Sequence, residues 1–177
     1  MIRLIRTIAA ASLLAAGLSS PAFAELPVGE KAPVFSTRAA LAGEEFGFSL
    51  RSALAKGPVV VYFYPKAFTQ GCTLEANAFA DAMPQFRKLG ASVIGMSNDD
   101  IATLKRFSKE ECRDAFPVGV ASTKLIAAFD VARENSDLAT RTSYVIAPSG
   151  RIAFVYTNGD YREHVTRTLA AVEALSK

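Results

Sequence analysis

Residues 58–75 read PVVVYFYPKAFTQGCTLE and change character halfway. The first half, from Pro58 to Tyr64, is a continuous apolar and aromatic run, which is typical of a strand buried on both faces of a parallel sheet. After Cys72 the apolar residues recur every three or four positions, as on one face of an amphipathic helix: Leu74, Ala78, Phe79, Ala82, Phe86 and Leu89. The pattern predicts a buried strand, a short polar loop and a long helix.

Cys72 falls in the first turn of the predicted helix. Unpaired backbone N–H groups and the positive end of the helix dipole favour a thiolate at such a position. Ligands of open α/β sheets bind beyond the carboxyl ends of the strands, which is where this loop lies. A structural cysteine would have apolar neighbours, whereas those of Cys72 are small or polar: Thr69, Gln70, Gly71 and Thr73. Cys72 is therefore a candidate nucleophile.

The rest of the chain predicts further elements around this unit. Before the buried strand we expect an irregular arm at 26–35, a hairpin of 36–41 with 45–48, and a short helix from Ser49 to Leu54. After the long helix we expect a strand at 91–97, a helix from Asp100 to about Cys112 capped by Asn98 or Asp99, a strand at 116–121, a helix at 125–129 and a polar connection at 132–140. The chain ends with a hairpin of 142–147 with 151–156 and a last helix, whose apolar stripe consists of Val165, Leu169, Val172 and Leu175. This order resembles a thioredoxin-like fold, an α/β fold with a central mixed sheet flanked by helices, here with an N-terminal extension.

The first 24 residues have the pattern of a secretory signal peptide. Arg3 and Arg6 precede an apolar stretch at 8–18, and the small-residue motif Ala22-Phe23-Ala24 follows it. The stretch is shorter than the roughly 20 residues that a membrane span needs. We expect cleavage after Ala24, a periplasmic or secreted product without stable membrane association, and a single domain over residues 25–177.

Charge and composition exclude several kinds of partner. Without Arg3 and Arg6 the chain carries 18 basic and 17 acidic residues, so the mature protein is nearly neutral. It has no basic stripe and no aromatic-rich basic motif, so nucleic acid is not an expected partner. With one histidine and two distant cysteines, no metal-ligand spacing exists, and no cofactor is predicted.

Two other uses of a reactive cysteine fit poorly. A dithiol oxidoreductase needs a second cysteine three positions before Cys72, and Thr69 stands there. A cysteine hydrolase needs a histidine partner. The single histidine, His164, begins the last helix, where we expect a solvated surface residue.

The motif Pro65-x-x-x-Thr69-x-x-Cys72 resembles the active site of the peroxiredoxins, the AhpC/TSA family, most closely their bacterioferritin comigratory protein or PrxQ-like group. The resemblance covers essentially the whole mature chain and rests also on Ala32-Pro33-x-Phe35, on Tyr62-Phe63-Tyr64-Pro65 and on Arg141-x-Ser143-Tyr144-Val145-Ile146. It implies a thiol-dependent peroxidase that reduces hydrogen peroxide and small organic hydroperoxides through a sulfenic acid on Cys72. The implied partners are a peroxide and a thioredoxin-like or other thiol reductant.

The chemistry of peroxide cleavage gives each motif residue an expected role. Cys72 supplies the thiolate, and the Thr69 hydroxyl can both accept from the peroxide and donate towards sulfur. The rigid donor fork of Arg141 can hold the thiolate and the peroxide oxygens together. Pro65 would shield the sulfur from water. Glu75 would orient Arg141. The expected substrate-binding residues are therefore Thr69, Cys72, Arg141 and Glu75.

Two questions stay open from the sequence. The alternative function is an exported thioredoxin-fold redox partner or sensor that exchanges disulfides through Cys72. Many members of the resembling group place a resolving cysteine five residues after the nucleophile, where this chain has Asn77, and others place it on the next helix, where Cys112 falls. We therefore expect Cys112 to resolve the sulfenic acid, in a monomer or weak homodimer.

Overall fold

The computed structural model describes residues 25–176, and β3 (Val59–Phe63) runs through its centre with all five residues buried. A long helix, α2 (Gln70–Lys88), connects β3 to β4 (Ser92–Ser97), and the two strands pair in parallel. The predicted β-α-β unit is confirmed. The expected signal peptide, residues 1–24, lies outside the described residues.

Seven strands form one mixed sheet in the order β2-β1-β5-β4-β3-β6-β7. The parallel strands are β3, β4 and β5 (Val118–Val120). The hairpin of β1 (Ser36–Leu41) and β2 (Glu44–Ser49) extends the sheet beyond β5, and β6 (Thr142–Ile146) with β7 (Ile152–Thr157) extends it antiparallel beyond β3. The predicted hairpins and the mixed sheet are confirmed. The observed ends of the hairpin strands differ from the predicted ones by about one residue.

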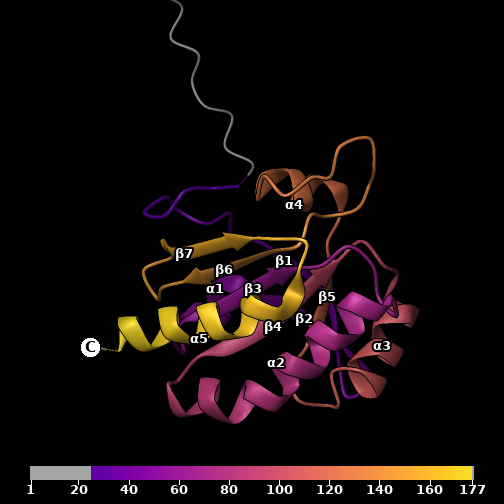
Figure 1. Cartoon of the computed structure of the whole chain (residues 1–177), viewed down its shortest axis with the longest axis horizontal. Coiled ribbons are helices and arrows are strands. Elements are labelled where there is room, and N and C mark those ends of the chain that lie inside the picture. Colours follow the sequence, from indigo (N-terminus) through magenta and orange to yellow (C-terminus); the bar gives the residue numbers. More distant parts are fainter. Residues whose placement is uncertain (1–24, 177) are drawn as a thin grey trace, which may run out of the picture.

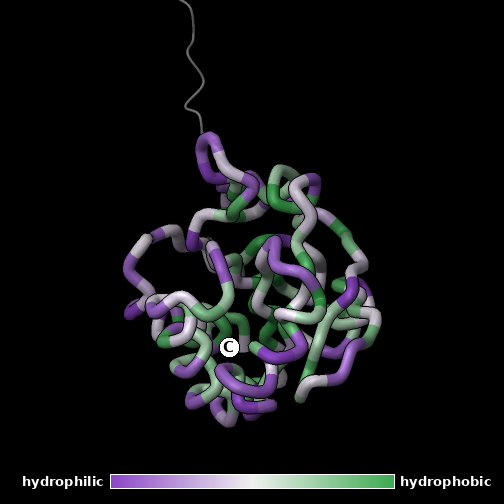
Figure 2. The backbone as a smooth tube through the Cα atoms, turned by 90° about the vertical axis from the view of Figure 1, so that its right-hand side faces the viewer, coloured by the Kyte–Doolittle hydropathy of each residue, from purple (hydrophilic) through white to green (hydrophobic). Residues whose placement is uncertain are grey.

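Helices cover both faces of this sheet. In Figure 1, α2, α3 (Ile101–Glu110) and α5 (His164–Leu175) lie together in front of it, while the short helices α1 (Leu50–Leu54) and α4 (Thr123–Ala128) belong to the other face. The side chains of β3 divide accordingly: Val60 and Tyr62 join the core under α2, and Val59, Val61 and Phe63 join the core under α1 and α4. Figure 2 shows hydrophobic segments inside and hydrophilic loops outside.

The N-terminal extension is irregular, as predicted, and lies against the β6–β7 hairpin. Gly29 N donates to the carbonyl of Ile152 at 2.8 Å, and Ala32 N donates to that of Gly150 at 2.9 Å. Among the described residues no helix combines the length and apolar character that crossing a bilayer requires.

The helix after β4 differs from the prediction at both ends. Its N-cap is Asp100, whose Oδ1 accepts from Thr103 N at 2.8 Å, and not Asn98 or Asp99. The capping side chain must sit in extended backbone directly before the helix, and two neighbouring acids made the position ambiguous. The helix ends at Glu110, so Cys112 lies in the turn that follows it.

Candidate active site

Cys72 is the third residue of α2, at the end of the sheet where β3 leads into the helix. Thr69 occupies the N-cap position, and Thr73 N donates to its carbonyl at 2.9 Å. The side chain of Cys72 lies at the helix N-terminus with only 2% of its surface exposed. The predicted place in the first turn is confirmed, and the dipole argument for a thiolate applies to it.

The loop before Cys72 is anchored from the neighbouring strand. The Asp99 carboxylate accepts from Ala67 N at 2.8 Å and from the Ser97 hydroxyl at 2.8 Å. Phe68 adopts a left-handed φ of 63° and packs edge-on against Phe107, with ring centroids 5.2 Å apart. The sequence suggested Asp99 as a helix cap, whereas the structure shows that it holds the active-site loop.

Arg141 reaches Cys72 because of the register between β3 and β6. Phe63, the last residue of β3, pairs with Thr142, the first of β6. Arg141 therefore stands where the Cys72 loop begins, and only 9% of it is exposed. Its Nη2 lies 3.4 Å from Sγ of Cys72, and its Nε donates to the carbonyl of Gly159 at 3.1 Å.

Glu75 forms an ion pair with Nη1 of Arg141 one helical turn after Cys72. It has no exposed surface, and its Oε1 has no hydrogen-bond partner. Burial raises the pKa of Glu75 to about 8, although the charge of Arg141 opposes this. The carboxylate lies behind the guanidinium, so its position fits the expected orienting role and offers no surface to a dissolved substrate.

Thr69 and Pro65 lie at the outer side of the site. Thr69 is exposed, and its hydroxyl donates to the carbonyl of Lys66 at 2.9 Å rather than to the sulfur. Pro65 is half-buried and lines a pocket of about 380 Å³ beside Arg141. The other residues of this pocket are Arg133, Ala139, Thr140, Thr157 and Gly159. No pattern in the sequence predicted that the connection at 132–140 would border the site.

His164 is buried, and the expectation of a solvated residue is wrong. It begins α5 with no exposed surface. Its Nδ1 lies 2.8 Å from the Ser143 hydroxyl and 3.8 Å from Oε1 of Glu75, and its Nε2 lies 3.0 Å from the carbonyl of Asn158. Burial lowers the pKa of His164 to about 4, so the ring is neutral at physiological pH.

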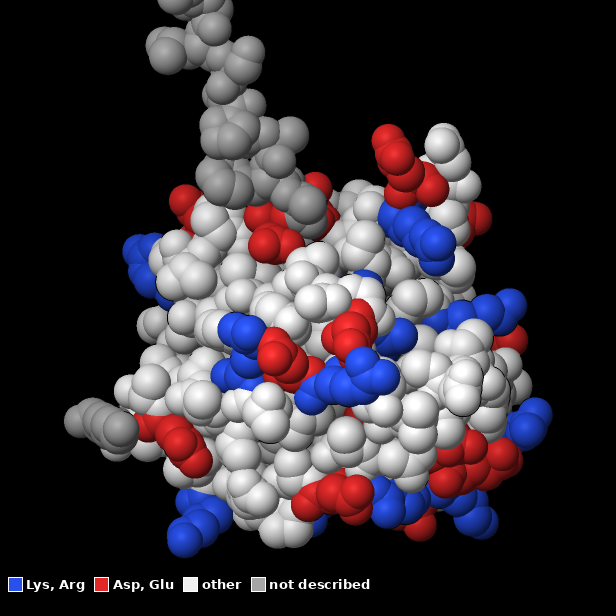
Figure 3. All heavy atoms as spheres, viewed as in Figure 1, with Lys and Arg blue, Asp and Glu red and all other residues white. Residues whose placement is uncertain are grey.

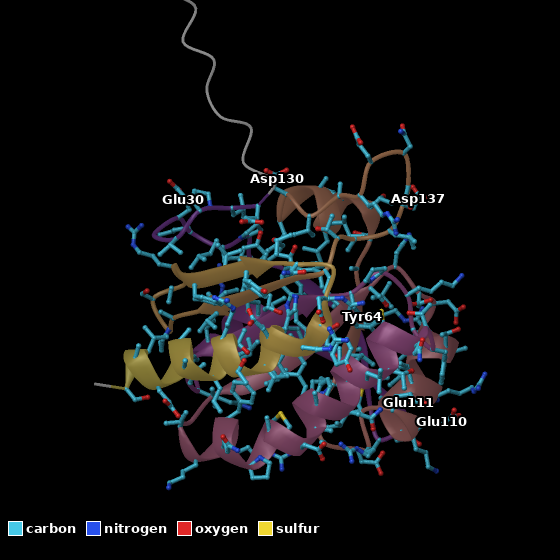
Figure 4. The ribbon with its side chains drawn as sticks, in the orientation of Figure 1. Glu30, Tyr64, Glu110, Glu111, Asp130 and Asp137 are labelled. Atoms are coloured by element: carbon cyan, nitrogen blue, oxygen red, sulfur yellow. The ribbon has the colours of Figure 1, made fainter. Side chains whose placement is uncertain are left out.

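Cys112 is also buried, and neither described cysteine is in a disulfide. Its turn is attached to α2 just beyond Cys72: Glu111 accepts from Asn77 Nδ2 at 3.3 Å, and Nη2 of Arg113 donates to the carbonyl of Asn77 at 2.6 Å. In Figure 4, Tyr64 marks the end of the sheet beside the site and Glu111 marks the end of α3. Burial raises the pKa of Tyr62, and negative charge on either cysteine acts in the same direction.

Over residues 25–176, no group of three or more histidine, cysteine, aspartate and glutamate side chains is placed to hold an ion. The site instead combines a cysteine at a helix N-terminus with a guanidinium, which suits the stabilisation of negative charge on sulfur and on a leaving oxygen.

Comparison with known proteins identifies the family. Residues 28–155 match the AhpC/TSA family. Chloroplastic peroxiredoxin Q of Oryza sativa subsp. japonica is 35% identical over 83% of this chain and 67% of its own length. Two solved structures share the fold. Peroxidoxin BcpB of Mycobacterium tuberculosis has a TM-score of 0.76, 29% identity, and coverage of 84% of this chain and 97% of its own.

The second structure concerns the alkyl peroxide reduction activity of the Xanthomonas campestris bacterioferritin comigratory protein. It has a TM-score of 0.69 and 30% identity, and it covers 79% of this chain and 92% of its own. These relatives favour the peroxidase over the redox partner that the sequence left as an alternative. The chain therefore belongs to the AhpC/TSA family and is a peroxiredoxin of the Q and Bcp kind, a thiol-dependent peroxidase.

Proposed function

We propose that Cys72 is the peroxidatic cysteine of this peroxidase and that Arg141 stabilises both its thiolate and the charge that develops on the peroxide. The observation that carries the proposal is the 3.4 Å separation between Nη2 of Arg141 and Sγ of Cys72 at the N-terminus of α2. A guanidinium stays charged at any physiological pH, so it favours the thiolate throughout the catalytic cycle. The largely buried setting strengthens this attraction because water screens it little.

The reaction needs no group beyond these residues and the peroxide. The Cys72 thiolate attacks the terminal oxygen of the hydroperoxide and forms the S–O bond while the O–O bond breaks. Sulfur is oxidised to sulfenic acid, and the second oxygen leaves with the electron pair and takes up a proton to become water or an alcohol. Donors that hold this leaving oxygen lower the barrier most, because they act on charge that appears only in the transition state.

In this proposal the peroxide binds in the pocket beside Arg141. Its volume of about 380 Å³ admits more than hydrogen peroxide, and Pro65 lines it without offering an N–H donor. Thr69 lies at the N-cap, where its hydroxyl can accept a hydrogen bond from an incoming peroxide. We include small organic hydroperoxides as substrates, which accords with the alkyl peroxide activity of the Xanthomonas campestris relative.

Cys112 is the resolving cysteine in this proposal. Its turn already contacts α2 at Asn77, and the two residues that follow it, Arg113 and Asp114, have left-handed φ values of 50° and 57°. Such backbone costs roughly 1–2 kcal/mol per residue outside glycine, so release of the turn recovers some of that energy. Burial raises the pKa of the Cys112 thiol, and it must leave the core before it attacks the Cys72 sulfenic acid.

A thiol reductant then reduces the enzyme again. Figure 3 shows basic and acidic side chains interleaved on the visible face rather than gathered by sign. We propose export to the periplasm or the outside of the cell, on the sequence of residues 1–24, and a thioredoxin-like reductant in that compartment. N-terminal sequencing of the exported protein tests this part, and a mature start at Met1 would contradict it.

The central experiment compares Cys72→Ser with the wild type. Sulfur-to-oxygen replacement removes the thiolate with little change in volume, so the fold should survive while consumption of hydrogen peroxide stops. Stopped-flow measurement of thiol loss should show one Cys72 thiol consumed for each peroxide. Oxidation of the wild type at the rate of free cysteine, or peroxidase activity retained by Cys72→Ser, would overturn the assignment.

A further inference from the structure

The buried histidine at the start of α5 takes no part in the proposed reaction. We propose that His164 is a positioning residue, which fixes the turn at Asn158 and Gly159 and thereby keeps Arg141 aimed at Cys72. This inference rests on the proposed function of Arg141 and adds the residue that maintains its geometry.

The hydrogen bonds of His164 determine its tautomer. The carbonyl of Asn158 can only accept, so Nε2 carries the proton and donates to it at 3.0 Å. Nδ1 is then bare and accepts from the Ser143 hydroxyl at 2.8 Å. Ser143 belongs to β6 and Asn158 follows β7, so the ring ties the start of α5 to both strands of the hairpin.

Arg141 is attached to the same turn. Its Nε donates to the carbonyl of Gly159, directly after the carbonyl that His164 holds, and its own carbonyl accepts from Asn158 N at 3.2 Å. The side chains of His164 and Arg141 thus bind successive carbonyls of one short turn. With Nε fixed there, the two terminal nitrogens point at Glu75 and at Cys72.

Burial is the main cause that keeps the His164 ring neutral, as this role requires, and the charge of Arg141 acts in the same direction. It lies 3.8 Å from Oε1 of Glu75 in α2, its ring meets that of Tyr156 in β7 at 4.8 Å, and Arg141 and Asp160 have opposite electrostatic effects on it. A charged ring would donate from both nitrogens and lose the acceptor that the Ser143 hydroxyl uses. Each ring nitrogen of His164 therefore has one hydrogen-bond partner, the Ser143 hydroxyl in β6 for Nδ1 and the Asn158 carbonyl after β7 for Nε2.

The test compares three substitutions that keep different parts of the ring. His164→Gln places an amide donor near the position of Nε2, His164→Asn reaches only the position of Nδ1, and His164→Leu keeps neither. Loss of the turn contact lets Arg141 drift, so His164→Leu and His164→Asn should lower the rate with hydrogen peroxide by about tenfold to a hundredfold, while His164→Gln recovers most of it. Thr168→Val is the matched control, because Thr168 is buried one turn along α5 and bonds only to its own helix.

Three readouts separate positioning from mere stability. Nitrogen NMR should show the imidazole protonated on Nε2. The double variant with His164→Leu and Arg141→Lys should reduce peroxide little more slowly than Arg141→Lys alone. The reason is that Arg141→Lys already removes the guanidinium that His164→Leu would misalign. In a Cys112→Ser background, alkylation by iodoacetamide at neutral pH should slow in His164→Leu, which reports on the Cys72 thiolate without any peroxide.

Several results would overturn the inference while leaving the peroxidase proposal intact. One is a rate in His164→Leu no lower than in Thr168→Val. Another is equal rates in His164→Gln and His164→Asn, a comparison that remains decisive if His164→Leu does not fold. Failure of the wild type to consume peroxide would instead contradict the proposed function, and the alkylation rates would still test the position of Arg141.

Discussion

Arg141 and Cys72 lie 69 positions apart in the sequence, yet Nη2 of the arginine is 3.4 Å from Sγ of the cysteine. The contact uses only Nη2 of the guanidinium, because Nη1 is paired with Glu75 and Nε donates to the carbonyl of Gly159. A planar group with donors in fixed directions can hold three partners at once, which a point charge cannot. The geometry therefore depends on arginine itself and not on positive charge alone.

The first prediction follows from that division of donors. Arg141→Lys keeps the charge but has one nitrogen for three partners, so it should lower the rate with hydrogen peroxide by about a hundredfold. Stopped-flow kinetics on folded protein measures the loss. Arg151→Lys is the matched control, since Arg151 bonds to the carbonyl of Gly29 far from Cys72. Equal rates for Arg141→Lys and wild type would mean that only the charge matters.

The second prediction separates activity from stability at Gly71. A Cβ atom at this position would lie 3.2 Å from Nη2 of Arg141. Gly71→Ala should stabilise the first turn of α2 by roughly 0.5 kcal/mol while it displaces the guanidinium and slows peroxide reduction by about threefold to tenfold.

Urea unfolding and peroxide kinetics together check the Gly71 prediction. Gly47→Ala on β2 is the control, because nothing lies within 4 Å of a Cβ built there. An active Gly71→Ala enzyme with unchanged kinetics would show that Nη2 has room to move without loss.

The third prediction concerns the hydroxyl of Thr69. It donates to the carbonyl of Lys66, so the oxygen of this exposed side chain stays available to accept a hydrogen bond from a peroxide. Thr69→Val removes the hydroxyl at nearly constant volume and should slow the reaction by about tenfold or more, whereas Thr69→Ser keeps it and should stay close to wild type. If both variants slow equally, Thr69 acts through packing of the loop.

Sequence periodicity predicts the secondary structure near Cys72 because most of the buried side chains there are apolar. The residues of β3 are buried on both faces. Of the predicted α2 stripe, Phe79, Ala82 and Phe86 are buried, whereas Leu74 is exposed because it lies on the opposite side of the first turn from the core. The same reasoning failed on α5. The apolar stripe expected there included Leu175, which is exposed, while the fully buried positions are His164, Thr168 and Val172. They recur every four residues, but two are polar, and hydrophobic periodicity does not detect polar residues that are satisfied by internal hydrogen bonds.

Contacts between residues far apart in the chain could not be predicted from local sequence patterns. Local pattern placed Arg141 at a strand start, and only the resemblance to a family connected it with Cys72. Its actual position depends on the register of β3 with β6 and on the turn at Gly159. Asp99 was interpreted as a cap for the same reason: its partner, Ala67 N, is 32 positions away. Contacts of this kind come from topology, which no single-segment pattern contains.

The fourth prediction uses pH to test the burial of His164. Its pKa falls from 6.5 in the unfolded chain to about 4 in the fold, so between these values only the unfolded chain takes up the proton. The contribution of His164 to stability is full above about pH 6.5 and is lost as the pH falls towards 4. Glu75 acts in the opposite sense, because its raised pKa makes its contribution full below about pH 4.5 and lost as the pH rises through 8.

The two effects oppose each other between about pH 4.5 and 6.5, so the wild type alone does not reveal the effect of His164 in that range. The difference in unfolding free energy between wild type and His164→Gln should shrink on acidification by up to about 3 kcal/mol. Urea unfolding of both proteins at neutral pH and in mild acid measures it. A constant difference would mean that His164 titrates alike in the folded and unfolded chains.

The last prediction assigns the fate of the Cys72 sulfenic acid to Cys112. The thiol is buried in the turn after α3, and that turn is tied to α2 through Asn77 and through an ion pair of Arg113 with Asp81 at 2.8 Å. Disulfide geometry requires Cα atoms within about 7 Å, and we expect the turn to detach from α2 before the bond closes. The wild type treated with one equivalent of peroxide should form a Cys72–Cys112 disulfide, seen by mass spectrometry of unreduced peptides.

Cys112→Ser should instead accumulate sulfenic and then sulfinic acid on Cys72, because no second thiol traps the intermediate. The first turnover should keep its rate, since Cys112 takes no part in the attack on peroxide. Arg113→Gln supplies a matched variant: it removes the ion pair with Asp81 but leaves both thiols, and easier detachment of the turn should speed disulfide formation. A wild type that forms no such disulfide, or a Cys112→Ser enzyme that recycles normally with its reductant, would leave resolution to an external thiol.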